Sequence, residues 1–379
     1  MTNKDLLQNI GAVAETTGLK EEQVVEAITE GLIAGCRRTH GVSTCRVELI
    51  EEKSDLKVYK QYMVVEDYDL TLDKTYTQLL LKDALEIDKK AKVGELLEVE
   101  IDPKEYGHYA MRDMKQRFND TILNYQKQNL HDFFKEHENE MLRARVIDES
   151  PTTYRIDLGK ETTLLPRSET LERDNLHVGA DVYVYISSVE MKPKGPKIYV
   201  TRKHPNLVIK LMELNIPEVA DGTVEIVGIS RDAGDRSKVG VRTNNPQVDP
   251  IGACVGEGGA RIRSVVSALA GEKIDLFRWS DNEKELIENA LQPSDVIAVT
   301  KINPRDKTAL AIVPNDQLSL AIGKQGQNVK LAVQASGWSI DIKSEEMAAE
   351  EGILYWASQL EKYRCVHVLW QKKSYLRKN

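Results

Sequence analysis

Residues 318–343 read LSLAIGKQGQNVKLAVQASGWSIDIK, and residues 251–276 read IGACVGEGGARIRSVVSALAGEKIDL. Each stretch contains an apolar helical pattern, a four-residue loop with glycine at both ends, a second apolar helical pattern and an Ile-Asp strand. At an offset of 67 residues the glycines coincide and apolar residues meet apolar residues; the offset falls by one at the final strand. A match of this length indicates an internal duplication.

A hairpin pattern precedes each copy, as EIVGISRDAGDRSKVGVRT before the first and VIAVTKINPRDKTALAIVP before the second. The repeated unit is therefore predicted to run strand, strand, helix, glycine loop, helix, strand. Glycine permits the tight reversal between the two helices and removes side chains that would hold a phosphate backbone away. The second helix then begins with free N–H groups beside that backbone. This is the pattern of the KH module, whose GxxG loop clamps about four nucleotides of single-stranded nucleic acid.

The two loops supply most of the candidate RNA contacts. Those of the second copy are Gly323, Lys324, Gln325, Gly326 and Lys330. Those of the first copy are Gly256, Gly258, Gly259, Arg261 and Arg263. The first loop carries Glu257, which repels phosphate, and Arg261 and Arg263 are placed to compensate. We expect the second copy to hold RNA more conventionally, and a first loop that serves only as scaffold stays open as an alternative.

Residues 141–202 contain five short strand patterns with glycines between or beside them, which is typical of a small five-stranded barrel. The stretches LLPRSE and HVGADVYVYI look like the OB-fold of ribosomal protein S-one, a barrel class that binds single-stranded RNA. Tyr154, Tyr183, Tyr185 and Tyr199 are candidate stacking rings. Tyr183 and Tyr185 share one strand face, so either both belong to a core or both are exposed.

A basic stretch, MKPKGPKIYVTRKHP, follows directly from the barrel pattern. Such a stretch is often only a solvated turn, but beside an RNA-binding barrel phosphate contact is favoured. Its candidate RNA contacts are Lys192, Lys194, Arg202 and Lys203.

The first part of the chain combines helices with strands. In GLKEEQVVEAITEGLIAGC, the residues Val24, Ile28 and Leu32 recur at helical spacing. Strand patterns follow in TCRVELI, LKVYKQYMVV and LLEVEI, and a long helical pattern covers 106–138 with a stripe that begins at Met114 and Phe118 and continues through Ile122 and Tyr125. A helix of this length is expected to connect two domains.

Charge distribution, hydropathy and cysteine content indicate which partners, location and metal sites to expect. The net charge is −8, and the acidic excess lies in residues 1–140. This distribution is typical either of an ordinary acidic solvated surface or of a front that binds a protein partner and a rear that binds RNA. There is no apolar run of about 18 residues and no signal-peptide pattern, so we expect a cytoplasmic protein without a membrane segment. Cys36, His40 and Cys45 lie close together, but a zinc site needs a fourth ligand, and ordinary thiols are favoured over a metal site.

The order of these parts resembles the bacterial NusA family of transcription elongation factors. The most specific stretches are KIYVTRKHPNLVIKLMELNIPEV, DPIGACVGEGGARI and LAIGKQGQNVKLAVQASGW, and AVAETTGLKEEQVVEAITEGL matches the first helices of the family. The resemblance implies a head that docks on RNA polymerase near the RNA exit channel. It implies that the barrel and KH domains follow the nascent transcript, promoting pausing and intrinsic termination, or antitermination together with other Nus factors. No cofactor and no catalysis are implied, and a monomer is expected.

The predicted fold is a multidomain α/β and β protein. It comprises an α+β head with a connecting helix (1–138), an OB-fold barrel (139–202), two tandem type II KH domains (203–278 and 279–345) and a helical tail (346–379). Two features depart from the family. GEGG stands where a basic loop residue is usual, and the match stops beyond Glu346, where the chain continues to a basic end.

The principal alternative is an RNA-binding subunit of an RNA-degrading complex. Exosome cap subunits share the barrel-then-KH order but carry one KH domain and no comparable head. Phosphorolytic nucleases place KH before the barrel and need large catalytic domains. The sequence contains no GxxxxGK[ST], HExxH or GxSxG motif, so nothing in it indicates an enzyme.

Overall fold

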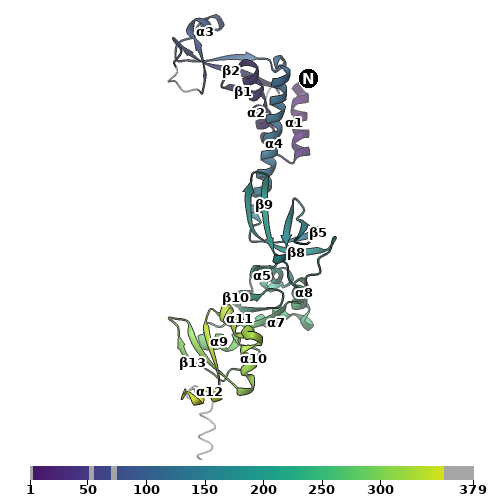
Figure 1. Cartoon of the computed structure of the whole chain (residues 1–379), viewed down its shortest axis with the longest axis vertical. Helices are drawn as coiled ribbons and strands as arrows, with labels where there is room; N and C mark the ends of the chain where they lie inside the picture. Colours follow the sequence, from purple (N-terminus) through teal and green to yellow (C-terminus); the bar gives the residue numbers. More distant parts are fainter. Residues whose placement is uncertain (1–2, 51–54, 70–74, 354–379) are drawn as a thin grey trace, which may run out of the picture. The chain divides into compact units, whose positions relative to one another are not determined.

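The computed structural model of the protein describes residues 3–50, 55–69 and 75–353 (Figure 1). The chain separates into two compact units. The first unit comprises Met1–Phe134 and Glu190–Pro196, and the second comprises Lys135–Val189 and Lys197–Asn379. Within the described ranges, no helix is long and apolar enough to cross a membrane.

The first unit is an α+β head. Its helices are α1 (Asn3–Thr17), α2 (Glu21–His40), α3 (Leu81–Ile87) and α4 (His108–Glu136). Its strands are β1 (Cys45–Ile50), β2 (Asp55–Val65), β3 (Thr77–Leu80) and β4 (Leu96–Ile101). The long strand β2 pairs antiparallel with β1 and β4 and parallel with β3.

The helical stripes predicted for the head are confirmed as its core. Val24 and Leu32 of α2 are buried, and the same helix packs on α1 through Val24 and on the sheet through Leu32. In α4, Ile122 is buried, with Phe118 and Tyr125 packed beside it. The unit boundary falls at Phe134, in the last turn of α4, so this helix connects the two units along the chain.

The second unit begins with a five-stranded, nearly closed barrel. Its strands are β5 (Met141–Glu149), β6 (Thr153–Asp157), β7 (Thr162–Pro166), β8 (Asp181–Lys192) and β9 (Gly195–Thr201), in the order β7-β6-β5-β8-β9. All five strands were predicted from the sequence. The two edge strands approach each other, since the hydroxyl of Thr163 in β7 donates to the carbonyl of Ile198 in β9 at 2.7 Å. The OB-like barrel is therefore confirmed.

Two KH domains follow, each with a helical segment, two strands, two helices and a strand in chain order; the opening segment is two helices in the first domain and one helix in the second. The first contains α5 (Pro205–Asn215), α6 (Pro217–Ala220), β10 (Val224–Asp232), β11 (Arg236–Thr243), α7 (Pro250–Val255), α8 (Ala260–Ala268) and β12 (Lys273–Arg278). The second contains α9 (Glu283–Ala290), β13 (Ala298–Asn303), β14 (Thr308–Val313), α10 (Leu318–Ile322), α11 (Gln327–Ser336) and β15 (Ser339–Ser344). In both, the middle strand pairs antiparallel with the first and parallel with the third.

The KH domains pack directly against each other. Helix α11 of the second lies on β10 and β11 of the first. At Gly228 in β10, an added Cβ would lie 2.2 Å from the carbonyl oxygen of Ala335 and 2.8 Å from the Trp279 ring. The strand backbone thus contacts the helix backbone with no room for a side chain. The hydroxyl of Ser230 also donates to the Gln334 amide oxygen at 2.7 Å.

The predicted helical tail is described only at its start. Helix α12 covers Glu345–Glu350, capped by the Ser344 hydroxyl, which accepts from the Met347 amide. The remainder of the prediction falls on 354–379, which lies outside the described residues.

Candidate nucleic-acid interface

Both GxxG loops lie at the surface as short 3-10 turns between two helices. The backbone dihedrals correspond closely: φ and ψ are 71° and 178° at Gly256, and 77° and 172° at Gly323. In each loop the last glycine donates its N–H to the carbonyl of the first at 3.1 Å. The duplicated sequence pattern therefore corresponds to a duplicated backbone geometry.

The two GxxG loops differ at their third position. The first copy has Gly258 at φ 56°, and the second has Gln325 at φ 54°. A residue with a side chain is strained in this left-handed region, and such strain is concentrated at functional sites. In the second copy Gln325 adopts this strained conformation, and its exposed side-chain amide lies at the tip of the loop.

The second loop is also the more cationic. Lys324 and Lys330 are exposed, and neither has an ion-pair partner among the residues that the structure describes. Helix α11 begins after Gly326, which provides no side-chain cap, so its first N–H groups are available to an anion. Two unpaired ammonium groups beside a helix N-terminus suit the phosphates of a passing strand.

The first loop has a different electrostatic environment. Glu257 is exposed, and Arg261 pairs with Glu218 at 2.7 Å while donating to the carbonyl of Ala253 at 2.8 Å. Arg263 is exposed and donates to the carbonyl of Gly258. Of the two arginines predicted to compensate Glu257, Arg261 is therefore paired within its own domain, whereas Arg263 lies beside the loop.

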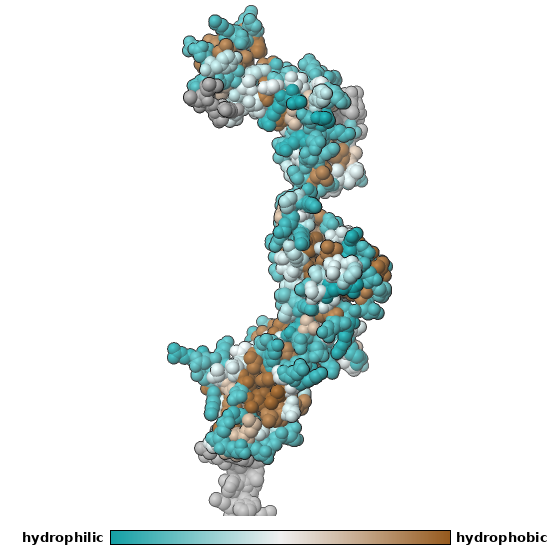
Figure 2. Space-filling view, in the orientation of Figure 1, coloured by the Kyte–Doolittle hydropathy of each residue, from teal (hydrophilic) through white to brown (hydrophobic). Residues whose placement is uncertain are grey.

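Apolar side chains adjoin the second loop. Leu320 and Ile322 of α10 are 47% and 37% exposed, and Figure 2 shows a hydrophobic patch over the part of this domain that contains α10. The corresponding residues of the first copy are the smaller Ala253 and Val255, both partly buried. The second copy thus offers apolar surface for bases next to cations for phosphates.

A polar cleft of about 340 Å³ lies beside the second loop. It is lined by Arg231, Asp232, Asp235, Lys324, Gln325, Gln327, Lys330, Leu331 and Gln334. The Gln327 amide donates to the carboxylates of Asp232 at 2.8 Å and Asp235 at 2.6 Å, and this hydrogen bond lowers the pKa of Asp235. The turn of the first KH hairpin is therefore hydrogen-bonded to Gln327, the residue directly after the second GxxG loop. Sequence reasoning missed this contact, although it predicted a hairpin in EIVGISRDAGDRSKVGVRT, which contains this turn.

Comparisons with known proteins match the head and the two KH domains. A family model described as the NusA N-terminal domain matches 5–128, and models of the NusA-like first and second KH domains match 202–279 and 283–350. The chain is 38% identical over 354 residues to the transcription termination/antitermination protein NusA of Halalkalibacterium halodurans, covering 93% of this chain and 91% of that protein. The chain belongs to the NusA family.

Further relatives carry the same name. NusA of Bacillus subtilis is 38% identical over 353 residues, covering 93% of this chain and 94% of that protein. NusA of Thermus thermophilus is 32% identical over 381 residues, covering 95% of each chain. The likeness to NusA proteins therefore includes the barrel, for which the sequence resemblance and the observed strand order agree.

One predicted RNA contact of this NusA-family chain is wrong. Arg202 is 2% exposed, and its guanidinium pairs with Asp174 at 2.7 Å. It also donates to the carbonyls of Tyr183 in the barrel and Ala268 in the first KH domain, at 2.6 Å and 3.0 Å. A guanidinium whose donors are used in this way joins the barrel to the KH domain and is not available to phosphate. The neighbouring Lys203 is exposed.

The other two basic candidates lie elsewhere. Lys192, the last residue of β8, and Lys194, on the turn between β8 and β9, are both exposed, and both belong to the first unit. Lys192 pairs with Glu190 at 2.6 Å. The structure therefore assigns this turn to a different unit from the GxxG loops.

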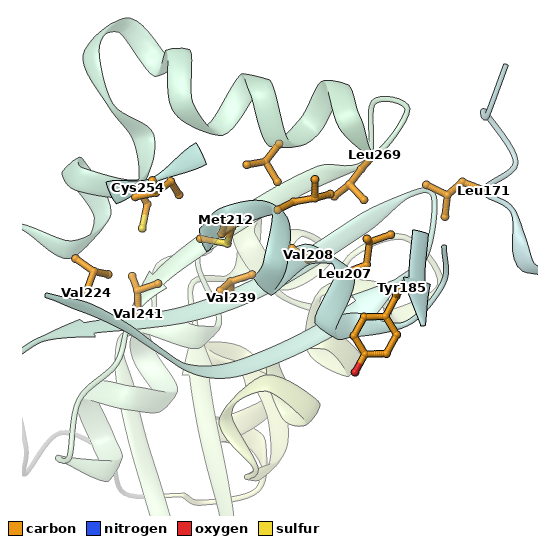
Figure 3. Packing of buried hydrophobic residues seen from close by; sticks show 13 residues of the cluster. Leu171, Tyr185, Leu207, Val208, Met212, Val224, Val239, Val241, Cys254 and Leu269 are labelled. Carbon is orange, nitrogen blue, oxygen red and sulfur yellow. The ribbon is translucent and has the colours of Figure 1, made fainter. Parts of the chain in front are cut away.

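The alternative left open for Tyr183 and Tyr185 is resolved in favour of the core. Tyr185 is 1% exposed and stacks on His204, with ring centroids 4.3 Å apart and planes 2° from parallel. Figure 3 shows Tyr185 beside Leu207 and Val208 of α5, in a cluster that also includes barrel residue Leu171. Tyr183 packs against the same cluster. The barrel and the first KH domain therefore share a core, and Tyr185 is not a stacking platform for RNA.

Cys36 and Cys45 are free, buried thiols in the core of the head. The hydrogen bond from Cys45 lowers the pKa of Cys36, and the same contact and burial raise the pKa of Cys45. Among the described residues, no group of three or more His, Cys, Asp or Glu side chains is arranged to hold a metal ion.

Proposed function

We propose that this chain is a transcription elongation factor that binds RNA polymerase through its head and nascent single-stranded RNA through its barrel and KH domains. In this role it modulates pausing and intrinsic termination, and antitermination when other Nus factors join. The domains are 1–138, 139–202, 203–278 and 279–345. The protein works as a monomer in the cytoplasm, where transcription takes place.

The observation that carries the proposal is the pair of exposed GxxG loops with matching backbones, the second flanked by Lys324 and Lys330. Such a factor needs no catalytic group. A ligand shifts a conformational equilibrium by its difference in affinity for the two states, so binding polymerase and RNA together favours the paused state. Family membership supports this function, since the relatives named above are termination/antitermination proteins.

A pausing assay with the full chain tests the proposal. Purified bacterial RNA polymerase is halted at a hairpin-dependent pause, and pause lifetime is measured with and without the protein. We expect a longer lifetime with the protein, and a smaller effect with Gly323→Asp. An unchanged lifetime together with retained RNA binding would contradict the polymerase part of the proposal, and absence of RNA binding would contradict the rest.

A further inference from the structure

A buried lysine crosses from the first KH domain into the second. Lys238 lies in β11 and is 1% exposed. Its ammonium donates to the carbonyls of Ala290 and Gln292, each at 2.7 Å, and to the side-chain oxygen of Asn328 at 2.8 Å. All three acceptors belong to the second domain: Ala290 is the last residue of α9, Gln292 follows that helix by two residues, and Asn328 lies in the first turn of α11. The three N–H donors of the ammonium are thus matched by three oxygens.

Asn328 connects the two helices that flank the second GxxG loop. Its amide nitrogen donates to the carbonyl of Ala321, in the last turn of α10, at 2.9 Å and to the carbonyl of Leu291 at 3.1 Å. The backbone nitrogen of Asn328 lies 2.7 Å from where a Cβ on Gly323 would stand. The Asn328 side chain therefore closes the base of the GKQG loop, and Lys238 fixes the side chain by occupying its oxygen.

The first copy closes its loop without help from another domain. Arg261 corresponds to Asn328 at the offset of the duplication, and it bonds to Ala253 and Glu218 within the first KH domain. The counterpart of Lys238 follows from the parallel strand register. Lys238 stands opposite Asp275, and Leu310 stands opposite Asp341 in the second copy. The lysine is therefore present in the first KH domain, whose sheet packs on the second domain. At the corresponding position the second KH domain has the apolar residue Leu310.

We propose that Lys238 is a positioning residue for RNA binding by the second KH domain, and that the GKQG loop acquires its binding geometry through contact with the first domain. The inference rests on the proposed function, because it concerns how the second loop grips RNA. A buried charge is a poor source of stability, and its best-attested role is to specify one arrangement. Here the arrangement that it specifies includes the junction of α10 and α11.

A double-mutant cycle in the full chain tests the proposal. Affinity for a fluorescent random-sequence single-stranded RNA of about 12 nucleotides, long enough for two KH sites, is measured by anisotropy. We expect Lys238→Met to weaken binding about fivefold to tenfold in the wild-type background and at most about twofold in a Gly323→Asp background. Leu310→Met is the matched control, and we expect it to leave affinity within about twofold. General destabilisation would instead lower affinity equally in both backgrounds.

Asn328→Asp provides a second test. Aspartate keeps an oxygen for Lys238 but loses the donor to Ala321, so we expect the same loss of affinity as for Lys238→Met. This variant decides the matter if Lys238→Met does not fold. The proposal is overturned if both variants bind RNA normally, or if the losses persist fully in the Gly323→Asp background.

A readout without RNA separates this proposal from the proposed function. In protein labelled with ¹⁵N-glycine, we expect Lys238→Met to shift the amide resonances of Gly323 and Gly326 and to leave those of Gly256 and Gly259 in place. Shifts without any effect of Gly323→Asp on RNA affinity would refute RNA binding by this loop, and with it the proposed role of Lys238. Unshifted resonances would refute the positioning role even if the loop binds RNA.

Discussion

The GxxG loops of the two KH domains have the same backbone conformation, but they differ in charge and in the residues that hold each loop in place. The GEGG loop is acidic at its tip and is closed by Arg261 and Glu218 of its own domain. The GKQG loop is cationic and is closed by Asn328, which Lys238 anchors from the neighbouring domain. The duplication has therefore conserved the geometry of the loop more strictly than its charge or its support. We expect the second copy to contribute more to RNA affinity.

The largest effect is expected at the contact between the copies. Gly228→Ala would place a methyl group 2.2 Å from the Ala335 carbonyl oxygen, so the strand or the helix must move. We expect the free energy of unfolding of the KH pair to fall by about 3 kcal/mol. Urea unfolding followed by tryptophan fluorescence measures it, in part through Trp279 and Trp338. The control is Gly107→Ala, where an added Cβ meets nothing within 4 Å. Equal stability of the two variants would contradict the tight contact.

The next effect compares the loops directly. Both Gly323→Asp and Gly256→Asp add a carboxylate at positive φ, but the new Cβ meets the Asn328 backbone in the second loop and the flexible Arg261 side chain in the first. We expect about 30-fold weaker RNA binding for Gly323→Asp, or about 2 kcal/mol, and about threefold weaker binding for Gly256→Asp. Anisotropy titration gives both values, with circular dichroism to verify folding. Equal and negligible losses would remove both loops from the interface.

A third prediction concerns the charge of Lys238. Burial lowers its pKa to about 8, whereas the ordinary value is 10.5. Asp275 and Arg236 face it from the first-domain sheet, and α9 and α11 present carbonyl and amide oxygens. Between these two values the unfolded chain binds more protons than the folded protein, so the free energy of unfolding rises with pH.

This rise can be measured as a difference between variants. We expect the wild type to gain on the order of 1–2 kcal/mol over Lys238→Met between about pH 7.5 and pH 9.5. Urea unfolding at both pH values provides the comparison, with Leu310→Met as the variant that should show no such gain. A pH-independent difference between the wild type and Lys238→Met would indicate that the ammonium has an unshifted pKa.

The smallest effect concerns the charges at the loop tips. Replacing Glu257 by Gln removes a repulsion, and replacing Lys324 by Gln removes an attraction. We expect RNA affinity to rise about twofold in the first case and to fall about threefold in the second, with a salt dependence about one unit shallower for Lys324→Gln. Titrations at several salt concentrations test this. Opposite signs would reverse the assignment of the stronger loop.

Local patterns were sufficient to predict most of the fold. The repeated glycine loops, the five barrel strands and the stripes of α2 and α4 are encoded by residue spacing, and all were confirmed. Helix α9 was missed as part of the second KH domain, although Leu286, Ile287 and Ala290 form its buried face. The helix is short and follows a charged turn, so its apolar positions gave a weak signal.

Contacts between domains could not be predicted in the same way. Arg202 stands in a basic stretch that suggests phosphate binding, yet in the interior it pairs with Asp174 of the barrel and donates to the carbonyl of Ala268 in the first KH domain. The burial of Lys238 could not be predicted either, because a lysine in a strand ordinarily indicates a solvated face. Charge and spacing describe what a residue offers, whereas its partner depends on how separate domains pack.

If both GxxG loops bind RNA, the backbone contact at Gly228 also affects which lengths of RNA bind best. Two sites held at one separation act as a bidentate receptor, and occupation of the first raises the effective concentration of the remaining RNA at the second. That gain is largest when the intervening nucleotides match the separation, and it decreases when they are too few to reach or numerous enough to form a loose loop. A KH pair packed in this way would therefore discriminate between transcripts by the spacing of two short elements.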